Sequence, residues 1–294
     1  MNQIKLIYYQ NFKIYFTFLL LWFSVQFEQV VENFVAYVLV ITIGIIHGAN
    51  DLLILSKSQQ KGNSFLKNLT IYVSIIILCI FIFYLQPLIA IVLFIMISAY
   101  HFGEEHFSDK ISESFIFNTG YYFAYGLLIF SMLFYNTLEE VNLIMNQLAD
   151  YSFQIKSIEI SLLISSIYCL FASVYLYWKK RISVKALLKE LFYILLLFLV
   201  FKATALILGF AVYFIFWHSL PSILHQVQYL SGHINKKSIL FYVKSASIYW
   251  LLSIVGMLIL YFTVPKIEQL APILFVILFA VTAPHMWVMH QIKN

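Results

Sequence analysis

The feature that most constrains this chain is a succession of long apolar runs. A helix needs about 20 residues to cross a hydrocarbon layer of about 30 Å. About ten runs of roughly this length carry few fixed charges. They cover residues 14–30, 33–55, 69–86, 88–106, 115–135, 158–178, 187–201, 203–224, 240–263 and 270–290. Because the runs are continuous and lack the alternation of a membrane barrel, they predict an all-α, polytopic membrane bundle of about 8–10 transmembrane helices.

Composition supports a membrane protein. Of the 294 residues, 63% are hydrophobic and only 11% are charged, far more apolar surface than one soluble core could bury. We interpret residues 1–294 as one membrane domain, with an additional amino-terminal anchor helix over 1–32 and the main bundle over 33–290. Three runs are less clearly defined than the others: the first, which holds Glu28, and the seventh and eighth, which only Lys202 separates.

The distribution of basic residues predicts the orientation. Three successive bases, Lys179 to Arg181, and the pair Lys236 and Lys237 fall in connections on one side of the membrane. Acidic residues such as Glu139 and Glu140 fall on the other side. The positive-inside rule then places both termini in the cytoplasm, in a multi-pass protein of the cell inner (plasma) membrane. The net charge of +5 is explained by this topology, so no nucleic-acid partner is indicated.

Four histidines fall late in four different runs. They are His47, His101, His218 and His285, in the second, fourth, eighth and tenth runs. Even-numbered runs all cross in the same direction, so these side chains reach a similar depth. One histidine in a membrane helix often only hydrogen-bonds a neighbouring helix. Four at one depth favour a shared metal site in the bundle core.

Two carboxylates follow these histidines at helical spacing. Asp51 lies four residues after His47, and Glu105 lies four residues after His101, so each pair shares a helix face. A carboxylate can bind the metal directly, or it can accept the second N–H of a ligating imidazole and fix its orientation. We expect Asp51 and Glu105 to orient ligands in this second way.

Four short motifs occur in order along the chain. They are His47-Gly-Ala-Asn-Asp51, His101-Phe-Gly-Glu-Glu105, His218-Ser-Leu-Pro-Ser222 and Pro284-His285. In order and rough spacing, from about residue 33 to 290, this set resembles the Brp/Blh family of bacterial β-carotene 15,15′-dioxygenases. The resemblance implies an integral membrane, Fe(II)-dependent enzyme that splits β-carotene with O₂ into two retinal molecules. A retinal-binding rhodopsin is a further expected partner.

The resemblance also implies a ligand set, with one departure. His47, His101 and His218 match family positions regarded as iron ligands, but Ser222 stands where the family commonly has a second histidine. His225 lies seven residues after His218, about 10.5 Å further along a regular helix, which is too far for both to bind one ion. His285 is therefore the preferred fourth ligand.

Two other classes of function stay open. Lys202 lies in an apolar stretch and could carry a retinal Schiff base, as in a retinal-binding membrane protein without oxygenase activity. A transporter, or a haem protein with paired histidine ligands, would also place polar groups on facing helices. A lysine-linked chromophore or a haem absorption band would identify these alternatives.

Overall fold

The computed structural model describes residues 3–58, 65–108, 110–111, 113–263 and 270–293, and the chain is helical throughout these ranges apart from short turns. No strand occurs among the described residues, so the predicted all-α class is confirmed. The helices follow one another in this order: α1 (Gln3–Gln26), α2 (Gln29–Leu39), η1 (Val40–Gly44), α3 (Ile45–Gly48), α4 (Asp51–Ser58), α5 (Phe65–Leu85), α6 (Pro87–Phe107), α7 (Phe115–Asn136), α8 (Leu138–Ala149), α9 (Ile155–Trp178), α10 (Val184–Ala203), α11 (Leu206–Val212), η2 (Tyr213–Ser219), α12 (Leu220–Ser231), α13 (Lys236–Thr263) and α14 (Leu270–Lys293).

Within the described part of the chain, 8 helical segments are long and apolar enough to cross a membrane. They are Gln29–Lys57, Phe65–Leu85, Pro87–Phe107, Phe115–Asn136, Ile155–Trp178, Leu206–Ser231, Lys236–Phe262 and Leu270–His290. The first and seventh runs form α1 and α10, which fall outside this set. Lys185, Lys189 and Glu190 make α10 too charged to qualify. The protein is thus a polytopic helical membrane protein, with a span number at the lower end of the expected range.

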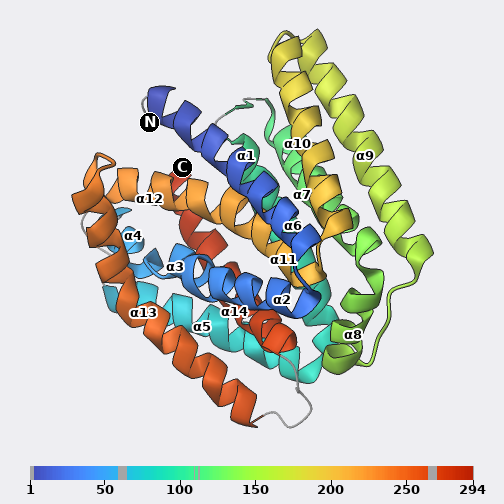
Figure 1. Cartoon of the computed structure of the whole chain (residues 1–294). Helices are drawn as coiled ribbons and strands as arrows, with labels where there is room; N and C mark the ends of the chain where they lie inside the picture. Colours follow the sequence, from blue (N-terminus) through green and yellow to red (C-terminus); the bar gives the residue numbers. More distant parts are fainter. Residues whose placement is uncertain (1–2, 59–64, 109, 112, 264–269, 294) are drawn as a thin grey trace.

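The two ends of the chain lie toward one side of the molecule. In Figure 1, α1 begins and α14 ends near each other, and the turn between α9 and α10 lies toward the same side. The short helix α8, with Glu139 and Glu140 in its first turn, lies toward the opposite side. This arrangement agrees with an even number of crossings.

Two glycines allow the closest helix contact, between α6 and α7. A Cβ atom at Gly103 would lie 1.9 Å from the carbonyl oxygen of Tyr122, and one at Gly126 would lie 1.9 Å from that of Ala99. Only glycine permits such a backbone approach, which is a common way of packing helices in membranes. The contact fixes the rotation of α6 and hence the direction of His101.

Two of the core segments contain a π-helical part. The segment Gln29–Lys57 contains η1, and Leu206–Ser231 contains η2. A π-helical turn inserts an extra residue and is frequent at functional sites. Here η1 directly precedes the turn that carries His47, and η2 carries His218 itself.

Candidate metal centre

The four histidines singled out in the sequence meet in the core of the bundle. His47 comes from α3, His101 from α6, His218 from η2 and His285 from α14, and each side chain is at most 3% exposed. Ring centroids lie 4.4 Å apart for His47 and His285, 4.8 Å for His101 and His218, and 5.0 Å for His47 and His218. All four rings line one cavity of about 30 Å³. That volume is enough for a water molecule or an ion.

The nitrogen atoms of this cluster suit a metal ion. Ligand atoms of His47, His101 and His285 all lie within 4.8 Å of one another. Both ring nitrogens of His47, and Nε2 of His285, are buried without a hydrogen-bond partner among the described residues. A buried polar atom without a hydrogen-bond partner lowers the stability of the fold, and coordination to a metal would give these nitrogen atoms a partner. Neutral imidazoles bind several transition metals, so this donor set alone does not select iron.

The carboxylate of Asp51 contacts His285. Asp51 Oδ1 lies 2.8 Å from His285 Nδ1, and Tyr72 donates its hydroxyl hydrogen bond to Asp51 Oδ2 over 3.0 Å. The sequence had paired Asp51 with His47 by helical spacing. That pairing is wrong, because α3 ends at Gly48 and α4 begins only at Asp51, so the two residues do not share one regular helix. Asp51 instead fixes the ring of His285 and leaves Nε2 available.

Two adjacent acids of α6 are both buried near the cluster. Glu104 Oε2 lies 4.0 Å from Nδ1 of His101, and Glu104 Oε1 accepts a hydrogen bond from Tyr100 at 3.1 Å. Glu105 Oε1 lies 3.2 Å from Nδ1 of His225. Sequence reasoning singled out Glu105 and missed Glu104, although the i, i+3 spacing from His101 also places Glu104 on the same helix face.

His106, His225 and Ser222 lie outside the lining of the histidine cavity. His106 Nε2 pairs with Glu190 at 2.8 Å, and His225 pairs with Glu105 as described. Ser222 is fully buried, and its hydroxyl accepts a hydrogen bond from Gln226 Nε2 at 3.3 Å. Of the histidines in the described ranges, the four named at the start therefore form the cluster.

A polar network that the sequence did not reveal holds the backbone of His47. The carbonyl oxygen of His47 accepts hydrogen bonds from Gln226 Nε2 and from the Tyr242 hydroxyl, each at 3.2 Å. Tyr242 also donates to Gln226 Oε1 at 2.7 Å, and Asn50 Nδ2 donates to the Tyr242 carbonyl at 2.9 Å. In the sequence, this network is visible only as single polar residues inside apolar runs. Their partners lie on distant helices, so spacing could not pair them.

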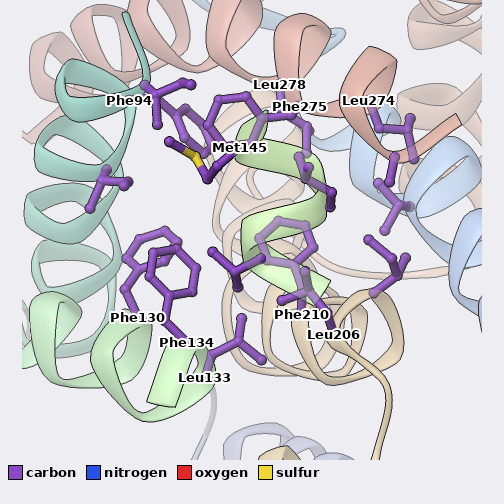
Figure 2. A pocket seen from close by; sticks show the side chains of 17 residues that line it. Phe94, Phe130, Leu133, Phe134, Met145, Leu206, Phe210, Leu274, Phe275 and Leu278 are labelled. Carbon is purple, nitrogen blue, oxygen red and sulfur yellow. The ribbon is translucent and has the colours of Figure 1, made fainter. Parts of the chain in front are cut away.

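An apolar cavity of about 90 Å³ adjoins the histidine cavity. Figure 2 shows its walls, where Phe94, Phe130, Phe134, Phe210 and Phe275 surround the space together with aliphatic side chains and Met145. Phe94, Phe210 and Leu278 line both cavities, so these three side chains lie between the two spaces. Every lining residue is hydrophobic, which suits an apolar ligand without hydrogen-bonding groups.

Comparison with known proteins shows which family the chain belongs to. The family model for β-carotene 15,15′-dioxygenases matches residues 38–293, a range that contains all four histidines. The chain belongs to the β-carotene 15,15′-dioxygenase family. No curated protein and no solved structure matches the chain. Family membership confirms the resemblance drawn from the four motifs, whereas all of α1 and most of α2 precede the matched range.

Proposed function

We propose that this protein is an Fe(II)-dependent dioxygenase that cleaves β-carotene at its central double bond and releases two retinal molecules. The observation that carries the proposal is the convergence of four buried histidines, from four separate segments, on one cavity beside an apolar pocket. Membership of the family supports the reaction. The reaction balances without a reductant: one O₂ is consumed, the central C=C bond breaks, and each carbon gains one oxygen atom as an aldehyde.

The iron ligands in this proposal are His47, His101, His218 and His285. The metal would supply O₂ binding and redox activation, which no protein side chain provides. Asp51 holds His285 in the tautomer that leaves Nε2 free for coordination, and the carboxyl group of Glu104 lies 4.0 Å from His101 Nδ1. The cavity between the rings is small, so water is largely excluded from the reacting atoms.

The apolar cavity is the proposed place for part of the polyene. Its aromatic and aliphatic walls offer dispersion contacts and no competing polar groups. Phe94, Phe210 and Leu278 form walls of both cavities, so an apolar chain held in this cavity would lie next to the histidine cluster. Retinal would leave into lipid or to a retinal-binding rhodopsin. We also propose an inner-membrane location with both termini in the cytoplasm.

The geometry does not favour the alternative functions. Lys202 is exposed in the last turn of α10 and lies away from both cavities, whereas a retinal Schiff base needs a buried lysine. A bis-histidine haem would need imidazoles on opposite faces of a macrocycle. The cavity between the rings, about 30 Å³, leaves no room for one.

The deciding experiment expresses the chain in bacteria that already make β-carotene. Unaltered protein, His101→Ala and the exposed control His233→Ala are compared by chromatography of extracts for retinal. We expect retinal from the unaltered chain and the control but none from His101→Ala, with bound iron measured on each purified protein. Intact carotene in cells that contain well-folded unaltered protein would contradict the proposed function.

A further inference from the structure

One face of α1 lies against the π-helical segment that carries His218. The face consists of residues spaced three and four apart, which share one side of a helix. Its members are Tyr9, Phe12, Lys13, Phe16 and Thr17. All of them contact Phe216 or Trp217, the two residues that precede His218 in the sequence.

Two hydrogen bonds join these segments. The Trp217 indole Nε1–H donates to Thr17 Oγ1 over 3.0 Å, and both groups are buried. The Tyr9 hydroxyl donates to the main-chain carbonyl oxygen of Phe216. The second hydrogen bond is made to the backbone of η2, so it restrains the π-helical turn as well as a side chain.

Ring contacts surround the two hydrogen bonds. The rings of Phe16 and Phe216 stack at 5.5 Å between centroids. Lys13 Nζ lies 4.0 Å from the centre of the Trp217 ring and 4.4 Å from that of Tyr193 on α10. The side chain of Lys13 is only 6% exposed, so its amine is enclosed between these two aromatic faces.

The position of these contacts couples them to the metal centre. Neighbouring residues point about 100° apart around a helix, so Trp217 can face α1 while His218 faces the cavity. A turn of π-helix is rare and short, and its rotation is set by what it contacts. Fixing Phe216 and Trp217 from outside therefore fixes the direction in which the His218 ring points.

We propose that this face of α1 is a positioning element for His218, with Thr17 and Tyr9 as the positioning residues. The inference rests on the proposed metal site. It assigns a role to a helix that precedes the range matched by the family model, residues 38–293, and that the sequence indicated only as an anchor. A helix that merely packs against the bundle would support overall stability, whereas a positioning helix also changes the geometry and affinity of the metal site.

The test measures Co(II) binding by the metal-free protein in detergent, because the visible bands of bound Co(II) report ligand number and geometry. The variant Tyr9→Phe with Thr17→Val removes both hydroxyls and keeps the side-chain shapes. The matched control, Tyr84→Phe with Thr70→Val, removes the same groups on α5, where Tyr84 is 82% exposed and Thr70 bonds only within its own helix. We expect the dissociation constant to rise about 10-fold in the first variant, with weaker visible bands, and to be unchanged in the control.

Conservative replacement separates positioning from packing. Thr17→Ser keeps the oxygen that accepts the indole hydrogen bond and should bind Co(II) like the unaltered protein, whereas Thr17→Val alone should not. Equal affinity and equal spectra in all variants would overturn the inference, as would a loss shown equally by Thr17→Ser and Thr17→Val. If the unaltered protein itself gives no Co(II) bands, the proposed metal centre fails, which is a distinguishable result.

Discussion

His285 Nδ1 and Asp51 Oδ1 lie 2.8 Å apart although 234 residues separate them in the chain. The second oxygen of Asp51 accepts the hydrogen bond of Tyr72, so the carboxylate is held between an imidazole and a phenol. Such a carboxylate orients a ligating histidine and raises its basicity. This contact connects the second and last predicted spans at the metal centre.

Replacing Asp51 should weaken metal binding without removing a ligand. For Asp51→Asn we expect iron affinity to fall about 10- to 100-fold, because the amide is uncharged and can also donate a hydrogen bond, so it no longer fixes the tautomer of His285 as a carboxylate does. Tyr72→Phe should cause a smaller loss, since the carboxylate keeps its bond to His285. Iron content per protein and retinal yield are the measurements, with the exposed Asp150→Asn as control. Full iron occupancy in Asp51→Asn would argue against this role.

The fourth ligand can be tested by comparing two histidines. His285→Ala should abolish detectable retinal formation and stable iron binding, because it removes one of the proposed ligand nitrogen atoms from the buried cluster. His225→Ala should retain iron, since the ring of His225 is 39% exposed and pairs with Glu105. Elemental analysis and turnover assays on both variants provide the comparison. The assignment is wrong if His225→Ala loses iron while His285→Ala keeps it.

Filling the apolar cavity should block substrate and spare the metal. Met145 is buried and lines the cavity, so Met145→Trp should lower retinal formation about 10-fold or more through lost space for the polyene. Leu143 lies nearby on α8 but is 58% exposed, and Leu143→Trp is the matched control. Iron content should equal that of the unaltered protein in both. Equal turnover in the two variants would remove this cavity from the substrate path.

The glycine contact between α6 and α7 should be essential for stability. Gly103→Ala forces a Cβ against the Tyr122 carbonyl, so we expect a loss of about 3 kcal/mol or more, or a failure to fold. At Gly256 on α13 an added Cβ meets nothing within 4 Å, so Gly256→Ala should be neutral or slightly stabilising. Thermal unfolding in detergent measures both. A similar melting temperature for Gly103→Ala would show that the helices can separate at little cost.

Much of the architecture was predictable because hydrophobicity is a local property. Long apolar runs predicted membrane helices, and two of them fell short of a candidate span: α1, which contains Gln, Asn and Tyr residues among its apolar ones, and α10, which contains several charged residues. The sequence placed the four histidines at one depth by counting ten spans of alternating direction, whereas 8 segments of the described chain are long and apolar enough to cross, so the meeting of the histidines was decided by tertiary packing. The sequence motifs also predicted the family, which the match over residues 38–293 confirmed.

The partners of individual side chains were decided by helix rotation and by breaks in helices. Helical spacing paired Asp51 with His47, but the break after Gly48 turned Asp51 toward His285. Spacing gave no way to connect Thr17 with Trp217, which are 200 residues apart. The sequence by itself determined that this is a helical membrane protein with histidines in four of its apolar runs, because each helix forms from local hydrophobicity and backbone hydrogen bonding. Only the tertiary structure decided which side chains meet, because close packing between helices sets the rotation of each one.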